Sequence, residues 1–167
     1  MLKKIIVALA FVMVVALTGC SSDTQLTLED LAKEKNLSVG ELNTDYLLNH
    51  QYKHDDGTFM SINITDIKVE KEIVLEKTTL HQSIVLASTE TMDRAKKMIN
   101  DALFFEVYTD KGRKGNLDIR MYLRETEDGK SDIILNCEKF DMTLFDYLVL
   151  GPAEEAQNER LVFAIPH

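Results

Sequence analysis

The sequence predicts an α+β fold, in which helices pack on one face of an antiparallel sheet. Three observations lead to this class. Apolar residues recur at helical spacing in residues 27–42 and 92–103, they alternate with polar residues within residues 62–75, 117–123 and 161–165, and short turn signals join neighbouring segments. The resulting order is two helices, two strands, a third helix, three strands and a last strand.

The start of the chain predicts an export signal. Lys3 and Lys4 precede residues 5–18, which are apolar except for the last. As a helix this segment spans about 21 Å at about 1.5 Å per residue, which is too short to cross a hydrocarbon layer of roughly 30 Å and is typical of a signal peptide. Leu17-Thr18-Gly19-Cys20 follows directly and resembles the lipobox of bacterial lipoproteins.

The lipobox resemblance implies a lipid on Cys20. In lipoproteins the cysteine thiol takes a diacylglycerol, the signal is cleaved just before it, and the cysteine becomes the first residue of the mature chain. Residues 1–19 are then the signal peptide, residues 20–25 a flexible leash and residues 26–167 one globular domain. We expect a protein anchored in the cell membrane on its extracytoplasmic side, because two or more acyl chains hold a protein stably on a bilayer.

The composition after the signal is acidic and nearly free of cysteine. Removal of two signal lysines leaves 17 Lys and Arg against 28 Asp and Glu, a net charge of 17 − 28 = −11. This charge disfavours nucleic acid and anionic lipid headgroups as partners. After Cys20 only Cys137 remains, so an internal disulfide cannot form and packing must stabilise the domain.

Residues 27–42, TLEDLAKEKNLSVGEL, predict an N-terminal helical hairpin. Thr27 is a typical N-cap, acidic residues follow in the first turn, and leucine and alanine recur on one face. Asn36 indicates a turn, and Ser38 would cap the second helix. An αα-hairpin that covers a sheet is the simplest interpretation.

The same stretch resembles two known helical pairs. It is similar to the helices of LysM domains, which bind cell-wall glycans, and to the helix-turn-helix, with Ala32 in the first helix, Leu37 at the turn and Leu42 on the second. The first resemblance implies a peptidoglycan-binding lipoprotein. The second is shared by some prophage lipoproteins that block superinfection.

Alternating residues predict the first strands. Ile62 and Ile64 share one face, and the apolar phase then shifts to Ile67 and Val69. A period of two cannot shift without a bulge or bend, so we expect one near Thr65-Asp66. Residues 80–87 predict the next strand. Ser88 or Thr89 would then cap a helix with apolar positions at Met92, Ala95, Ile99, Ala102 and Leu103.

Residues 104–108, 117–123 and 133–137 predict a three-stranded meander. In its middle strand one face should be buried, and it consists of Leu117, Ile119, Met121 and Leu123. Arg120 and Arg124, on the other face, should meet water or a partner. The two turns, Lys111–Gly115 and Glu125–Gly129, carry opposite charges and would polarise the domain, with one tip available for docking.

The end of the chain is less regular. Residues 143–150 form an apolar run without a clear period, residues 152–159 suggest a short helix that begins at Pro152, and residues 161–165 alternate as a strand. The whole element order is similar to the nuclear-transport-factor-like cone and, less closely, to the cystatin-like fold. Both likenesses concern the fold and imply no function.

Two segments contain residues that could bind a metal ion or act as a nucleophile. If the second helix continued, His50 and His54 would share a face at a spacing used by zinc ligands, although Asp55-Asp56-Gly57 indicates that a helix ends there. Cys137 falls on the Ile133 face of its strand, which predicts a buried and inert thiol, and a nucleophilic role would need a base such as His81. We expect neither a cofactor nor a metal. If a metal were bound, His50 and His54 would be the candidate ligands.

These observations lead to one expected function and three alternatives. The expected function is a non-enzymatic, lipid-anchored envelope domain that binds an unknown protein or ligand. The alternatives are a LysM-like peptidoglycan binder, a prophage superinfection-exclusion lipoprotein, and a metal-assisted envelope enzyme.

Overall fold

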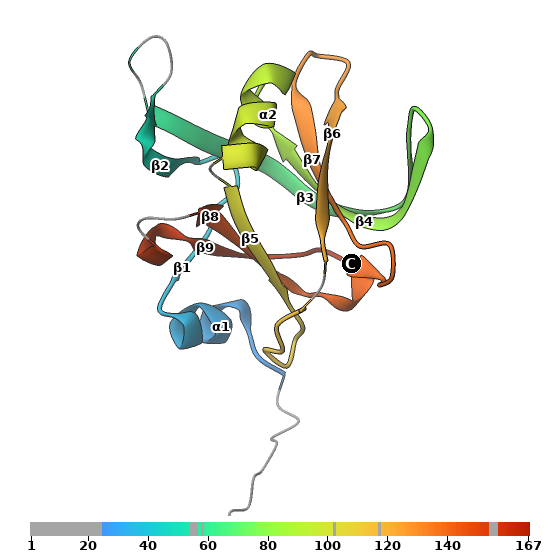
Figure 1. The fold of residues 1–167 in the computed structure, drawn as a ribbon. Helices are drawn as coiled ribbons and strands as arrows, with labels where there is room; N and C mark the ends of the chain where they lie inside the picture. Colours follow the sequence, from blue (N-terminus) through green and yellow to red (C-terminus); the bar gives the residue numbers. More distant parts are fainter. Residues whose placement is uncertain (1–24, 54–56, 58, 102, 117, 154–156) are drawn as a thin grey trace, which may run out of the picture.

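The structure is a computed structural model, and it describes residues 25–53, 57, 59–101, 103–116, 118–153 and 157–167. Cys20, His54, Ala102 and Leu117 lie outside these described residues. Within them the chain forms two α-helices and two β-sheets, and the larger sheet curls strongly (Figure 1). This mixed, mostly sheet content is consistent with the predicted α+β class, but two sheets, one of them with a parallel strand pair, replace the single antiparallel sheet expected from the sequence. No helix in this part of the chain is long and apolar enough to cross a membrane.

The smaller sheet has four strands and is covered on both faces. Its order is β1 (Ser38–Val39), β9 (Leu161–Ala164), β8 (Tyr147–Pro152) and β5 (Leu103–Tyr108). One face packs against Leu31 and Ala32 of helix α1 (Leu28–Lys35), and the other joins the main core between the sheets. Every residue of β8 is buried. This explains why residues 143–150 show no alternation, since a strand buried on both faces is apolar throughout.

Helix α1 begins and ends as the sequence predicts. The Thr27 hydroxyl accepts a hydrogen bond from the N–H of Asp30 (3.1 Å), and the Asp30 carboxylate accepts one from the N–H of Thr27 (3.1 Å). This capping box satisfies two N–H groups that a helix start leaves free. The helix ends at Asn36, whose φ of 55° is left-handed.

The prediction of a second helix in the N-terminal hairpin is wrong. Residues 38–39 form β1, which pairs in parallel with β9, and the N–H of Gly40 donates to the Val162 carbonyl (2.8 Å). A helix of about one turn is marginal in water, whereas the edge of β9 offers backbone partners at once. The LysM and helix-turn-helix resemblances therefore lose the helical pair on which they depended.

The larger sheet has five strands in the order β2 (Asp45–Lys53), β3 (Phe59–Leu75), β4 (Thr78–Ser88), β7 (Ser131–Asn136) and β6 (Arg120–Glu125). The register of β3 on β4 shifts between Ile64 and Asp66, which confirms the bulge predicted near Thr65. The prediction of a helix that reaches His50 is also wrong, because His50 lies in strand β2. The β-type residues that follow offer this segment a strand partner in β3.

The prediction of a three-stranded meander is correct in part. Strands β6 and β7 form the predicted antiparallel hairpin, and Gly129 in its turn has a φ of 76°. However, β5 pairs with β8 over six residues and belongs to the other sheet. The turn that follows β5 returns only far enough for one bridge between Lys114 and Tyr108. A long-range apolar partner therefore replaces the local pairing. The two charged turns lie at opposite ends of the molecule (Figure 1).

The main core lies between the sheets and includes Ala95 and Met98 of helix α2 (Met92–Asp101). This helix begins after Thr91, whose carbonyl accepts a hydrogen bond from the N–H of Ala95 (2.9 Å). Ser88 and Thr89 are thus not its caps. The hydroxyl of Ser88 instead donates to the Ser131 carbonyl (2.8 Å), which holds the end of β4 to β7. The predicted last strand is confirmed as β9.

The predicted short helix at residues 152–159 is wrong within the described residues, which form a strand end and a 3-10 turn instead. Pro152 ends β8, and a single 3-10 turn covers Gln157–Glu159. Residues 154–156 are outside the described part of the chain. Pairing with Leu103 of β5 keeps Pro152 extended, so it cannot serve as the first residue of a helix.

Candidate functional site

Strand β4 has a free edge along its first half. It pairs with β3 from Thr78 to the end of the strand, but it pairs with β7 only over Ile84–Ala87. Among the described residues, residues 78–83 therefore have no strand partner on the β7 side. Such an edge exposes backbone N–H and C=O groups that can pair with another extended chain.

Asn136 marks the point where β7 leaves β4. Its side-chain amide donates to the His81 carbonyl (2.9 Å) and to the Ser83 hydroxyl (2.8 Å), and the residue is buried. The chain then turns, and the N–H of Phe140 donates to the Cys137 carbonyl (3.3 Å). This turn carries the chain away from the sheet, so it creates the free edge.

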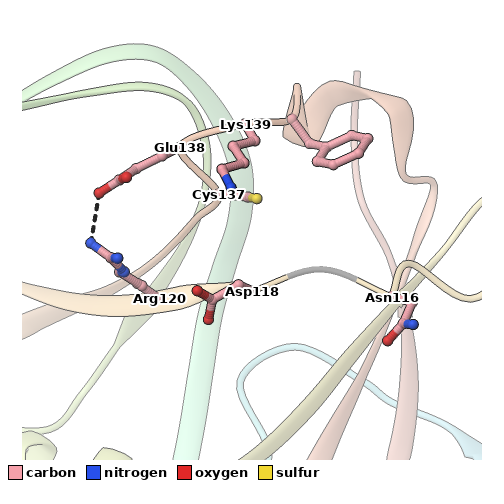
Figure 2. A pocket seen from close by; sticks show the side chains of 7 residues that line it. Asn116, Asp118, Arg120, Cys137, Glu138 and Lys139 are labelled. Carbon is pink, nitrogen blue, oxygen red and sulfur yellow. Dashed lines mark hydrogen bonds and ion pairs between the residues drawn. The ribbon is translucent and has the colours of Figure 1, made fainter.

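A groove of about 440 Å³ lies beside the free edge. Its walls are residues 78–82 of β4 and residues 136–141. A second hollow, of about 370 Å³, lies beside Asn116, Asp118 and Arg120 and shares residues 137–140 as a wall. We call the shared segment, Cys137–Phe140, the ridge. Figure 2 shows Asp118 and Arg120 across the second hollow from Glu138 and Lys139 of the ridge.

Apolar side chains are unusually exposed around this region. Phe140 on the ridge is 52% exposed, Leu144 just after it is 59% exposed, and Val74 on β3 is 65% exposed. The 3-10 turn Met142–Leu144 packs against β4, and Val74 is paired with Thr79 of the free edge. Exposed apolar side chains that gather on a folded surface usually mark an interaction site, and of these three Phe140 lines both hollows.

The charges near the ridge are mixed. The Arg120 guanidinium donates to the Glu138 carboxylate (2.6 Å), and the pKa of Arg120 is raised by a hydrogen bond with Tyr122 and by the charge of Glu138. His81 faces Glu72 with a nitrogen–oxygen distance of 3.8 Å. Asp141 accepts hydrogen bonds from the N–H (2.8 Å) and the hydroxyl (2.5 Å) of Thr143.

The sequence singled out two residues that line the groove, Cys137 and His81. Cys137 is a buried free cysteine whose side chain belongs to the main core, as expected for a small hydrophobic residue. His81 is exposed and faces Glu72. Among the described residues no hydrogen bond joins the two, so the geometry supplies no activated nucleophile.

The candidate metal ligands are not brought into a described site. The backbone of His50 lies in β2, and His54 is outside the described residues. In the part of the chain that the structure describes, His, Cys, Asp and Glu form no group of three or more that could hold a metal ion.

A hollow beside α1 has a structural explanation. It is lined by Lys35, Tyr108 and Arg160 among others. The Arg160 side chain donates to the carbonyls of Pro152 (3.0 Å) and Ala153 (2.8 Å) and lies 3.4 Å from the Phe104 ring centre. Burial and a hydrogen bond to Glu106 raise the pKa of Tyr108. These polar groups are engaged with one another, so the groove beside β4 is the stronger candidate.

Comparison of the chain with models of protein families, with curated proteins and with solved structures finds no match. The site therefore has to be judged from its own geometry. Sequence reasoning missed the ridge and the free edge. The available signal was an aromatic residue in the polar stretch NCEKFD directly after an apolar strand.

Proposed function

We propose that the protein is a lipid-anchored lipoprotein of the cell envelope whose domain binds another molecule without catalysing a reaction. The observation that carries the anchor is the order of features at the start of the chain: two lysines, an apolar segment too short for a membrane span, and Leu17-Thr18-Gly19-Cys20. A lipid on Cys20 would place the domain at the membrane surface on the extracytoplasmic side.

The attachment point of the leash supports an orientation for the domain. The N–H of Leu26 donates to the Asp110 carbonyl (2.7 Å), and the Tyr147 hydroxyl donates to the Leu26 carbonyl. Residues 20–25 can extend by at most about 20 Å at roughly 3.5 Å per residue. The end of the domain that contains Asp110 and α1 would therefore stay near the bilayer.

The groove favours a binding role. Among the described residues it offers a strand edge that β7 does not pair with and an exposed aromatic ring, Phe140, both of which are elements of recognition. The groove volume of about 440 Å³ is within the range of roughly 300–1,000 Å³ that ligand sites have. We therefore assign binding to the groove and membrane attachment to Cys20.

The proposal also includes a finer fold assignment, to the nuclear-transport-factor-like cone or, less closely, to the cystatin-like fold. A curled sheet beside one packed helix is the feature that the nuclear-transport-factor-like cone and the cystatin-like fold would share with this chain. The single N-terminal helix α1 departs from the helical pair on which that comparison relied. The fold likeness therefore contributes no ligand to the proposal.

The anchor is tested by replacing each cysteine separately and labelling cells with a radioactive fatty acid. We expect Cys20→Ala to abolish the label and Cys137→Ala, the matched control, to keep it, because Cys137 is buried in the core. The control should also remain in the membrane fraction. Labelled Cys20→Ala protein, or unlabelled wild-type protein, would contradict the proposal. Retention of the wild type on purified peptidoglycan would instead favour the glycan-binding alternative.

A further inference from the structure

We propose that the free edge of β4 at Thr78–His81 binds an extended peptide segment of a protein partner by β-strand addition. This inference rests on the proposed binding role and names the class of partner. The binding mode requires free backbone groups, room beside them, an apolar anchor and compatible charge.

The free backbone groups are identified by one hydrogen bond. The His81 carbonyl accepts from the Asn136 side chain, so the backbone groups of His81 point away from β3 and toward the groove. In a strand the N–H and C=O of one residue lie on the same edge, and alternate residues repeat this direction. The N–H and C=O of Thr79 therefore face the groove as well. An incoming strand can pair with the N–H and C=O of Thr79 and with the N–H of His81, whereas the His81 carbonyl already accepts from Asn136.

The edge lacks two of the protections that natural edge strands often have. Exposed edges are commonly blunted by lysine, by proline or by a covering segment. The residues along this edge are Thr78, Thr79, Leu80, His81 and Gln82, with neither lysine nor proline among them. A groove of about 440 Å³ lies beside them, although the 3-10 turn Met142–Leu144 also contacts β4. Gln82, with a φ of 50°, distorts the strand and limits the edge on one side.

The opposite wall supplies the apolar anchor. The Phe140 ring is half-exposed on the ridge, across the groove from the edge, and Leu144 is exposed on the turn that packs against β4. An apolar side chain of the added strand can cover this ring while the strand backbone pairs with Thr79 and His81. Backbone pairing would then give affinity, and the contact with Phe140 would give specificity.

Charge decides between two occupants of the edge. A second copy of this chain would bring another mature domain of net charge −11, from 17 Lys and Arg and 28 Asp and Glu. Repulsion between two such domains disfavours self-association. Along the groove the charges are mixed, since Glu138 is paired with Arg120 and Lys139 lies beside Asp141, so the net charge of the domain is what favours a basic occupant. The occupant we infer is therefore a partner segment that combines apolar and basic residues.

The test uses the full purified chain in detergent and a capped octapeptide of alternating lysine and valine. Amide hydrogen exchange is measured with increasing peptide. We expect saturable binding with a Kd of about 1 mM or lower and exchange at Thr79 and His81 slowed by about tenfold or more. A peptide with every second amide methylated, and one with glutamate in place of lysine, should not protect these amides.

Two variants and a matched control locate the effect. Thr79→Pro removes one edge N–H, and Phe140→Ala removes the exposed ring without touching the sheet. Each should weaken peptide binding at least about fivefold, since each removes one of the two recognition elements. Leu42→Ala, which truncates an exposed apolar residue outside the groove, should leave binding unchanged.

Three outcomes would overturn the inference: no protection at Thr79 and His81, equal effects of Phe140→Ala and Leu42→Ala, or protection without peptide that grows with protein concentration. The last outcome would assign the edge to a second copy of the chain. The mass of the lipid on Cys20, measured on the same sample, reports the anchor separately. A failed anchor is thus distinguishable from a failed peptide site.

Discussion

Arg124 links three strands of the larger sheet, and its replacement by alanine is the most informative test of the fold. Its guanidinium donates two hydrogen bonds to the Glu70 carboxylate (2.8 Å each) and two to the Asp132 carboxylate (3.0 and 2.5 Å). Strands β4 and β7 separate β3 from β6 in the sheet order, so Glu70 reaches Arg124 only because the sheet curls. The sequence predicted that Arg124 faces water or a partner, and the structure shows it paired within the sheet.

The magnitude follows from burial and from the pKa of Glu70. The side chains of Arg124, Glu70 and Asp132 are 29%, 24% and 9% exposed. The Arg124 hydrogen bond lowers the pKa of Glu70 from 4.5 to about 2. At about 1.4 kcal/mol per pH unit this corresponds to roughly 3 kcal/mol, and partial exposure reduces it to about 1.5–2 kcal/mol. Asp132 would also lose its partner, so we expect Arg124→Ala to destabilise the protein by about 2–3 kcal/mol.

The pH dependence has a definite sign. The pKa of Glu70 is lower in the folded protein than its usual value of 4.5, so its ionised form stabilises the fold. This contribution is complete above about pH 5 and is lost as the pH falls from 4.5 toward 2. The difference in stability between the wild type and Arg124→Ala should therefore shrink over this range.

Urea unfolding of the purified wild type and variants at neutral pH and at steps down to about pH 3 measures both effects. Arg120→Ala is the matched control on the same strand. Its side chain and that of its partner Glu138 are 55% and 62% exposed, so it should change the unfolding free energy by no more than about 0.5 kcal/mol. Equal losses for the two variants, or an Arg124→Ala deficit that is constant down to pH 3, would refute the reasoning.

Three further predictions concern packing and metal. Gly40→Ala should lower stability by about 1–3 kcal/mol in thermal or urea unfolding, because a Cβ there would lie 2.2 Å from the buried Phe163 ring. Leu135→Ala should reduce the unfolding free energy by about 3–5 kcal/mol and Ile119→Ala by only about 1–2 kcal/mol, since the first is fully buried and the second partly buried; the reverse order would show that the burial of these two side chains is misassigned. A chelator should leave the melting temperature unchanged, and a clear drop would revive the histidine metal site.

The parts of the fold that the sequence predicted are set by neighbouring residues. The Thr27 cap of α1, the bulge near Thr65 and the turn at Gly129 each depend on hydrogen bonds or dihedral angles within a few positions. Alternation likewise predicted β9. For the site, the same local reasoning correctly predicted that Cys137 is buried. It also predicted the lipid on Cys20, which stays a prediction because it concerns residues outside the described structure.

Tertiary structure decided which segments pair, because backbone hydrogen bonds between distant strands leave little trace in the local pattern. Phe104 could pair with a nearby strand or with Gly151, and the folded chain uses Gly151. Residues 38–39 became a strand because the edge of β9 was available to them. The free edge of β4 exists because Asn136 ends its neighbour early and bonds to His81 across the gap. A period-two pattern reports which face of a strand is buried, whereas an edge becomes free only through what the neighbouring strand does.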